Sequence, residues 1–228
     1  MALVPAAGRG VRLGHERPKA LVPVAGESLL SRAVRGLLAS GVVREVVIAS
    51  PEDELTAVRA EVESLGSAHV VVGGADRTDS VRRALAEAER RAPDLSTVLV
   101  HDAARAFTPA SVICDVVGAV ESGADAVVPV LPVSDTIKSV DASGVVDRTV
   151  DRSPLRAVQT PQGFAAEVLR EAYAAADGAA TDDAGLVERI GRPVATVAGH
   201  PHALKITTAF DLAIAESVLA AAPVGDPA

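Results

Sequence analysis

Short, almost wholly apolar runs alternate along this chain with longer segments in which apolar residues recur every three or four positions. Runs without polar alternation are typical of strands covered on both faces, whereas the three-to-four spacing is typical of amphipathic helices. The expected strands are Ala2–Pro5, Glu45–Ala49, His69–Val72, Thr97–Val100, Ala126–Val130 and Pro193–Ala198. This alternation predicts a doubly wound α/β fold, in which helices cover both faces of a mostly parallel sheet in three layers.

The expected helices lie between and after these strands. The first carries an apolar stripe from Leu29 to Leu38 and ends at Gly41, since glycine is favoured just past a helix. The others run from Pro51 to about Leu65, from about Thr78 to Arg91, from Pro109 onward, near Ala165–Ala176, near Asp182–Ile190 and from about Thr208 to Ala220. No repeat divides the chain, so residues 1–228 are expected to form a single domain.

Residues 134–156 interrupt the alternation with two short β-like runs around an Asp-Ala-Ser-Gly turn. These runs carry too few apolar residues for a place in the central sheet, so we expect a β-hairpin arm that projects from the domain. An isolated hairpin is only marginally stable, which favours packing against a partner subunit. A flap folded back on its own domain is the alternative.

Composition excludes several classes of function. The formal net charge is −8, and the chain has three Phe, one Tyr and no Trp. A global basic field and a base-stacking platform are therefore missing, which argues against binding to nucleic acid or an anionic membrane. The single cysteine, Cys114, excludes an intramolecular disulfide framework. No run approaches the roughly 20 apolar residues of a membrane span, and the N-terminus lacks the pattern of a secretory signal, so we expect a cytoplasmic protein.

The connection after the first strand, LVPAAGRGVRLGHERPKAL (residues 3–21), carries the candidate chemistry. Within its first stretch, residues 6–10, only Arg9 has a side chain larger than methyl, since the other four positions are Ala6, Ala7, Gly8 and Gly10. Backbone N–H groups can then approach an anion closely. The loop also holds four basic residues, Arg9, Arg12, Arg17 and Lys19, against one acid, Glu16. It matches neither a dinucleotide fingerprint nor a P-loop. A triphosphate site at the strand end is the favoured interpretation, and a solvated basic loop is the alternative.

The segment from Ala6 to Arg12, followed by Pro18-Lys19, is similar to the signature loop of sugar-1-phosphate and related nucleotidyltransferases. Five further stretches follow in order: GGADRTDS at 73–80, VHDAAR at 100–105, QTPQGF at 159–164, TDDA at 181–184 and KIT at 205–207. Together they resemble the 2-C-methyl-D-erythritol 4-phosphate cytidylyltransferase family, over essentially the whole chain. The resemblance implies a Rossmann-like nucleotidyltransferase fold. It also implies transfer of a cytidylyl group from CTP to a polyol phosphate, with release of pyrophosphate, in the non-mevalonate isoprenoid pathway.

The chemistry of this reaction requires cations rather than a nucleophilic side chain. A phosphate monoester has a second pKa of about 6, so it is already an anionic nucleophile at pH 7. Stabilising charge on the reacting phosphorus calls for positioned cations, and the resemblance assigns that role to Arg12 and Lys19. It assigns nucleotide binding to Ala6, Ala7, Gly8, Gly10, Gly74, Ala75, Ser80, Asp102 and Ala103. Asp102 is also the candidate for a direct or indirect contact to Mg²⁺, the expected cofactor.

The turn at residues 73–75 could equally be a plain strand-ending turn. Arg105 has two interpretations of equal weight, one structural and one functional, whereas His101 is expected to be a packing residue.

On the side of the polyol phosphate, the resemblance points to Asp135, Thr136, Arg152, Thr160, Thr181 and Lys205. It implies that the arm residues reach the active site of a second subunit, and hence a homodimer through the arm. Thr181 could equally be a helix N-cap, and Asp182 and Asp183 suit the first turn of a helix.

The motifs leave three competing functions. One is a cytidylyltransferase that acts on another polyol phosphate, such as ribitol 5-phosphate, because the nucleotide motifs would be almost the same. A second is a sugar nucleotidyltransferase that uses a purine nucleotide, for which GTP or ATP would outcompete CTP. The third is a non-catalytic nucleotide-binding domain, which would bind CTP without turnover.

Overall fold

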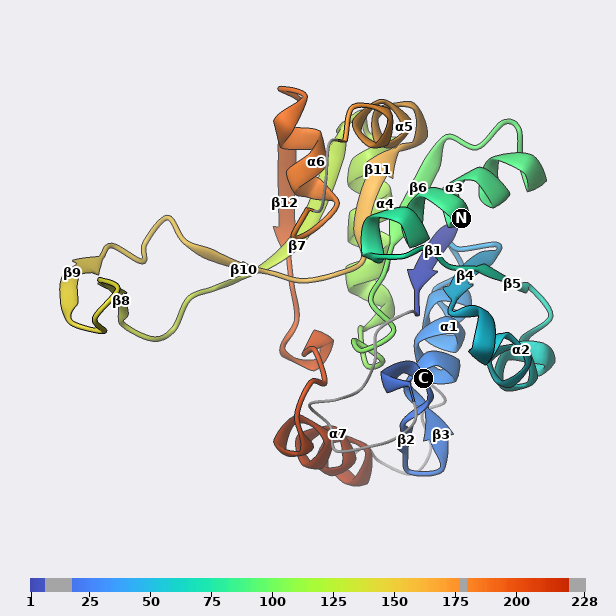
Figure 1. Ribbon diagram of the computed structural model, residues 1–228, viewed down its shortest axis with the longest axis horizontal. Coiled ribbons are helices and arrows are strands. Elements are labelled where there is room, and N and C mark those ends of the chain that lie inside the picture. The colour runs from blue at the N-terminus through green and yellow to red at the C-terminus, as the bar shows by residue number, and fades with distance from the viewer. Residues whose placement is uncertain (7–17, 177–179, 222–228) are drawn as a thin grey trace.

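The computed structural model describes residues 1–6, 18–176 and 180–221 (Figure 1). Its central sheet has eight strands: β1 (Ala2–Pro5), β4 (Val46–Ser50), β5 (Ala68–Val72), β6 (Thr97–Val100), β7 (Ala126–Pro132), β10 (Arg156–Val158), β11 (Gln162–Ala165) and β12 (Val194–Ala198). The path through the sheet is β10-β7-β11-β6-β1-β4-β5, and β12 also pairs with β7. The predicted mostly parallel α/β sheet is confirmed.

Helices cover the sheet on both faces, as the apolar runs predict. They are α1 (Leu29–Ala39), α2 (Leu55–Val62), α3 (Arg77–Arg91), α4 (Ala110–Glu121), α5 (Ala166–Ala174) and α6 (Ala184–Arg189). The last helix, α7 (Ala209–Ala221), packs instead in a smaller third cluster with Val24 and Ile206. One core cluster combines α1, α2 and α4 with one face of the strands, and a second combines α3, α5 and α6 with the other. Within β1, Ala2 and Val4 belong to the first cluster and Leu3 to the second. Successive side chains of a strand point to opposite faces, so an uninterrupted apolar run serves both layers.

Local sequence signals set the helix ends. The Ser28 hydroxyl accepts the backbone N–H of Ser31 (3.1 Å) at the start of α1. Gly41, with φ of +77°, follows its end, where a left-handed residue is favoured. The helix expected from Pro51 to Leu65 is α2 with a 3-10 turn at each end, Glu52–Glu54 and Glu63–Leu65. Helices α5 and α6 are shorter at both ends than the predicted segments Ala165–Ala176 and Asp182–Ile190.

Two antiparallel strands, β10 and β11, were not expected. β11 lies between β6 and β7 and pairs antiparallel with both. The four residues of β11 include a polar residue, Gln162, and a glycine, so they do not form an apolar run. Gly163 is required there because a Cβ would lie 2.5 Å from Cγ1 of Val116 on α4. The tertiary packing of α4 on the sheet, rather than local propensity, therefore selects this strand.

The hairpin arm projects away from the sheet, as predicted (Figure 1). It consists of β8 (Ile137–Val140) and β9 (Val146–Val150), which form a separate two-stranded sheet. The Asp141 carboxylate accepts the backbone N–H groups of Ser143 and Val145 in the turn. The alternative of a flap folded onto its own domain is wrong. A second small hairpin, β2 (Pro23–Val24) with β3 (Glu27–Ser28), lies beside α7 (Figure 1). None of the helices in the described ranges is long and apolar enough to cross a membrane.

Phe164 on β11 offers a test of the sheet topology. Its side chain is fully buried in the cluster under α3 and α5. We expect Phe164→Ala to lower the free energy of unfolding by about 3–5 kcal/mol, because it removes apolar contacts and leaves a cavity. Urea denaturation measures the change. Phe210→Ala is the matched control, since Phe210 is 74% exposed and a surface substitution shifts stability by about 0.5 kcal/mol at most. Equal losses in both variants would contradict this placement of β11.

Candidate active site

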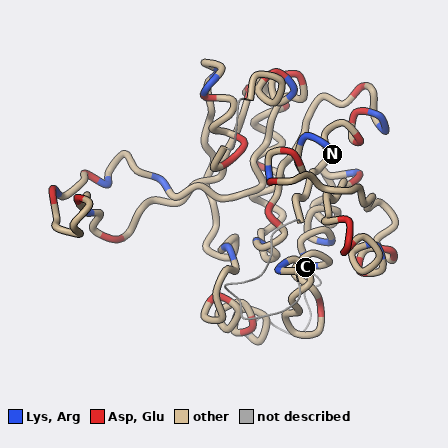
Figure 2. Tube along the Cα trace, in the orientation of Figure 1, with Lys and Arg blue, Asp and Glu red and all other residues tan. Residues whose placement is uncertain are grey.

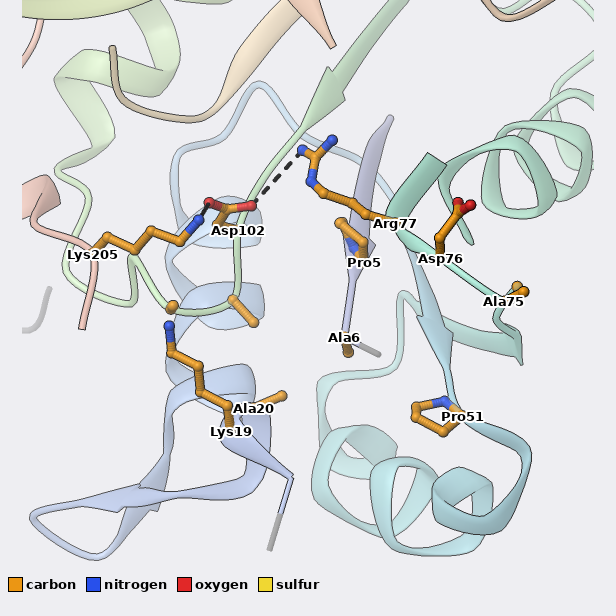
Figure 3. Close-up of a pocket in the computed structure, with 13 residues that line it drawn as sticks. Pro5, Ala6, Lys19, Ala20, Pro51, Ala75, Asp76, Arg77, Asp102 and Lys205 are labelled. Atoms are coloured by element: carbon orange, nitrogen blue, oxygen red, sulfur yellow. Dashed lines mark ion pairs between the residues drawn. The ribbon is translucent and has the colours of Figure 1, made fainter. Parts of the chain in front are cut away.

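A cavity of about 470 Å³ opens at the carboxyl ends of the central strands. Figure 3 shows it between the ends of β1 and β6, the 3-10 turn at Lys19–Leu21 and the start of α3. β1 lies between β4, the next strand of the central sheet along the chain, and β6, and it pairs parallel with both. The order of the strands therefore reverses at β1. A crevice forms at such a switch point because the loops on the two sides diverge. The fold alone therefore places a ligand site here.

Seven of the predicted site residues line this cavity: Ala6, Lys19, Gly74, Ala75, Asp102, Ala103 and Lys205. They come from segments far apart in the sequence, and the strand ends bring them together. The other predicted members of the first loop, Ala7, Gly8, Gly10 and Arg12, lie outside the described residues.

Asp102 is the acidic centre of the cavity wall. One carboxylate oxygen lies 2.7 Å from Nζ of Lys205, and the other lies 3.8 Å from Nη2 of Arg77 (Figure 3). Burial alone raises the pKa of the Asp102 carboxyl, but Lys205 and then Arg77 outweigh it, so the pKa lies below its usual range. Asp102 is therefore ionised at neutral pH and presents a hard oxygen ligand to the cavity.

The backbone of Asp102 is held from behind by two buried side chains. The Thr160 hydroxyl accepts the Asp102 N–H (3.0 Å) and lies 3.0 Å from Nδ1 of His101. Burial lowers the pKa of His101 to about 4, so its ring is neutral at physiological pH. His101 packs as predicted. Thr160, a predicted substrate contact, supports the loop in this chain and does not line the cavity.

The turn at residues 73–76 forms the opposite wall. The Ser80 hydroxyl accepts the Gly74 N–H (3.0 Å) and donates to the carbonyl of Asp76 (2.7 Å). Ser80 is fully buried, so it shapes the turn from beneath, whereas Gly74 and Ala75 face the cavity. A Cβ on Gly74 would lie 2.1 Å from Oδ2 of Asp79, so only glycine fits at this position.

Lys205 is positioned by the segment before it. Arg105 donates to the carbonyls of Ala203 (2.6 Å) and Val158 (3.2 Å), and the Gln159 amide donates to the carbonyls of His200 and Ala203. These bonds tie the chain just before Lys205 to the end of β10. Of the two interpretations of Arg105, the structure supports the structural one, with backbone carbonyls rather than an acid as its partners.

Sequence reasoning missed a buried ion pair behind the cavity. The Arg77 guanidinium donates to both carboxylate oxygens of Asp183 (3.0 and 2.6 Å), and the Tyr173 hydroxyl donates to the same carboxylate. Asp183 is fully buried at the N-cap position of α6. Thr181 is exposed and is not the N-cap, so that interpretation is wrong. Asp182 does act in the first turn, where it accepts the Gly185 N–H. Arg77 lies in the motif at 73–80 and Asp183 in the motif at 181–184, so their membership of these motifs was the one sequence feature that marked them.

Comparison with known proteins agrees with this geometry. The family model described as 2-C-methyl-D-erythritol 4-phosphate cytidylyltransferase matches residues 1–221. The chain belongs to this family. It is 76% identical over 221 residues to the cytidylyltransferase of that name from Saccharopolyspora erythraea, covering 96% of this chain and 99% of the relative. It is 58% identical to the one from Nocardia farcinica, over 96% and 93% of the two chains.

Solved structures of the cytidylyltransferase family share the fold. The crystal structure of the Thermus thermophilus enzyme superposes with a TM-score of 0.77 at 37% identity, covering 95% of this chain and 97% of that one. A 4-diphosphocytidyl-2C-methyl-D-erythritol synthase from Anaerococcus prevotii gives a TM-score of 0.81 at 26% identity, over 96% and 97% of the chains. The Rossmann-like nucleotidyltransferase fold is thereby confirmed.

In this member of the cytidylyltransferase family, the predicted arm residues do not join the cavity of their own chain. Asp135, Thr136 and Arg152 are exposed on the projecting arm, and none of them lines the cavity. The Arg152 guanidinium donates to the carbonyl of Ser134 on the other side of the arm's base. Figure 2 shows acidic and basic residues interspersed along the arm.

His101 makes stability depend on pH in a defined window. Its pKa is about 4 in the folded chain against 6.5 ordinarily, so between these values the unfolded chain binds a proton that the folded chain does not. The contribution of neutral His101 to the free energy of unfolding is therefore present above pH 6.5 and is lost as the pH falls toward 4. Between pH 7 and pH 5 the loss is about 2 kcal/mol.

Urea unfolding of the wild type and of His101→Gln at both pH values measures this term. We expect the substitution to remove it, so that the variant loses about 2 kcal/mol less than the wild type between pH 7 and pH 5. The same pH dependence in the two proteins would contradict the assignment. Asp102 does not contribute in this window, because its lowered pKa affects stability only at more acidic pH.

Proposed function

We propose that the chain transfers a cytidylyl group from CTP to 2-C-methyl-D-erythritol 4-phosphate, giving 4-diphosphocytidyl-2-C-methyl-D-erythritol and pyrophosphate. The observation that carries the proposal is the cavity at the strand ends, where Lys19, Lys205 and the ionised Asp102 meet in a member of this family. Both substrates are small, water-soluble polyanions, which supports a cytoplasmic site of action. None of the cavity residues within the described ranges favours ribitol 5-phosphate over 2-C-methyl-D-erythritol 4-phosphate.

The reaction is an in-line displacement at the α-phosphorus of CTP. A phosphate oxygen of the acceptor forms the new bond to phosphorus, and the bond from phosphorus to the bridging oxygen of the β-phosphate breaks. The bond electrons leave with pyrophosphate, and no proton transfer is needed because the monoester is already ionised. The protein must therefore bring two polyanions together and neutralise the charge that develops between them.

The cations divide into two groups that suit the two substrates. Lys19 lies on the 3-10 turn that follows the first loop, at the end of the cavity where the triphosphate is proposed to bind. The family resemblance assigns the same catalytic role to Arg12, so Arg12 and Lys19 form the proposed catalytic pair. Lys205 comes from a separate segment and lies beside Asp102, so it can bind a phosphate monoester with its own charge (Figure 3). Thr181 is proposed as a hydroxyl contact to the polyol.

We also propose that Asp102 holds Mg²⁺ together with phosphate oxygens of the nucleotide. Mg²⁺ prefers few carboxylates plus substrate phosphates and water to an all-protein cage. The site fits this preference, since Asp102 is an ionised carboxylate on the cavity wall and no group of three metal-ligating side chains occurs within the described ranges. The ion would neutralise phosphate charge. Asp102 would orient it, while Arg77 and Lys205 balance the charge of the carboxylate.

The arm is proposed to form a homodimer and to bring Asp135, Thr136 and Arg152 to the cavity of the partner subunit. Its strands form a sheet only with each other within the described chain, and Val140, Val145 and Val146 are 57%, 62% and 54% exposed. Apolar side chains on a two-stranded sheet need a second surface to be buried. A closed two-fold dimer supplies one for each arm.

The first test is turnover and its dependence on Lys19. With CTP and 2-C-methyl-D-erythritol 4-phosphate, we expect release of pyrophosphate in a coupled assay. Lys19→Ala is expected to lower kcat/KM by about a hundredfold to a thousandfold, because it removes a charge that stabilises the transition state. Its melting temperature should be unchanged. Arg59→Ala, an exposed cation on α2 outside the cavity, is the control and should retain activity. Faster turnover of ribitol 5-phosphate, or CTP binding without turnover, would overturn the proposal.

The second test concerns sharing of the site. Lys19→Ala and Arg152→Ala are each expected to be nearly inactive. When the two variants are unfolded together and refolded, half of the dimers contain one chain of each kind. One of the two sites in such a dimer has both residues intact, so activity should return to about a quarter of the wild-type value. No recovery, in a mixture shown to contain mixed dimers, would mean that Arg152 acts within its own chain.

A further inference from the structure

Asp183 is a buried carboxylate behind the cavity that has no part in the reaction described above. It is fully buried and does not line the cavity. Its oxygens accept two hydrogen bonds from the Arg77 guanidinium, at 3.0 and 2.6 Å, and a third from the Tyr173 hydroxyl. Desolvating such a pair costs about as much as the attraction returns, so a buried ion pair is a weak source of stability. The role of the pair therefore lies in where it places the Arg77 guanidinium.

Arg77 stands between two carboxylates. It is the first residue of α3 and lines the cavity, with Asp183 on its buried side and Asp102 on its open side. Nη2 lies 2.6 Å from Asp183 but 3.8 Å from Oδ1 of Asp102. The longer distance exceeds that of a hydrogen bond. The guanidinium therefore forms a long ion pair with the Asp102 carboxylate and no hydrogen bond to it (Figure 3).

The two carboxylates compete for one guanidinium. Arginine remains charged, and a bidentate pair with a carboxylate is the favoured geometry. Asp183 has that geometry, and the Tyr173 hydroxyl donates one further hydrogen bond to it. The pKa of Tyr173 is raised, first by burial and then by Asp183, so the hydroxyl stays protonated. If Asp183 were neutral, Arg77 would need to move by only about 1 Å to reach a charge-assisted hydrogen-bond distance to Asp102.

We propose that Asp183 is a positioning residue for nucleotidyl transfer, which holds Arg77 away from Asp102 so that an oxygen of Asp102 stays available to the nucleotide and its cation. The inference rests on the proposed function. In the wild type, Lys205 holds one Asp102 oxygen and Arg77 screens the other without occupying it. Without Asp183, both oxygens would be taken by cations of the protein itself.

The test compares Asp183→Asn, which is isosteric but neutral, with the double variant Asp183→Asn/Arg77→Gln. Tyr173→Phe is the matched control, because it removes one hydrogen bond to Asp183 and leaves the ion pair. Three properties are measured for each protein: kcat and KM for CTP, the affinity for Mn²⁺ in the presence of CTP by electron paramagnetic resonance, and the melting temperature. A crystal structure of Asp183→Asn gives the position of Arg77 directly.

For Asp183→Asn we expect the distance from Arg77 to Asp102 to fall from 3.8 Å to a hydrogen-bond distance below about 3 Å. Mn²⁺ affinity and kcat/KM should both fall about tenfold or more, since a small displacement at a reacting centre has a large effect on rate. The double variant should recover most of the Mn²⁺ affinity, because no guanidinium remains to occupy Asp102. Tyr173→Phe should melt at a lower temperature with Mn²⁺ affinity unchanged.

Two results would overturn the inference. One is a lower melting temperature in Asp183→Asn with Mn²⁺ affinity and kcat/KM per folded molecule unchanged, which is a purely structural effect. The other is a double variant as impaired in Mn²⁺ binding as the single one. Should Asp183→Asn fail to fold, Arg77→Gln alone decides, since the inference requires undiminished Mn²⁺ affinity and a tenfold loss would refute it. A wild-type protein without turnover would overturn the proposed function instead, and Mn²⁺ binding would then decide the inference by itself.

Discussion

Burial of the central sheet on both faces is the constraint on which the rest of this molecule depends. Side chains of β1, β4, β6 and β7 are committed alternately to two apolar clusters, so polar chemistry has no place along these strands. It can begin only where they end. Because β6, β1, β4 and β5 run parallel, their carboxyl ends reach the same edge. The cavity, Asp102 and the turn at 73–76 all lie at that edge for this reason.

The charges around the cavity form an ordered series rather than a diffuse cluster. The charges alternate in sign along the series Asp183, Arg77, Asp102 and Lys205. The two outer pairs are close, at 2.6 Å between Arg77 and Asp183 and 2.7 Å between Lys205 and Asp102. The widest gap, 3.8 Å, separates Arg77 from Asp102. A polyanion entering the cavity therefore meets a carboxylate that its neighbours already balance, together with Lys19 on the facing turn. Two negatively charged substrates can approach a protein with a net charge of −8 because the local balance differs from the total.

The sequence predicts the layers, the central parallel strands and the arm because these depend on period and composition, which are local properties. β11 escaped prediction because Gln162 and Gly163 owe their place to partners on α6 and α4, which no window of sequence contains. The same holds for the site. Asp102 and Lys205 could be picked out by motif, but their ion pair joins segments 103 positions apart. The TDDA segment predicts a charge at a helix terminus for Asp183, because nothing in that segment shows that Arg77 lies opposite it. The hydroxyls of Ser80 and Thr160 bond backbone groups behind the cavity wall, which the motifs do not show.

The stretch of three residues from Val158 to Thr160 has a mechanical consequence. The Val158 carbonyl binds Arg105, the Gln159 amide binds the segment that carries Lys205, and the Thr160 hydroxyl binds the Asp102 backbone. The arm joins the domain immediately before this stretch, at the start of β10. A displacement at the base of the arm would therefore act on the hydrogen bonds that position both Asp102 and the segment before Lys205. A partner that binds the arm would thus also restrict the movement of Asp102 and Lys205 relative to each other.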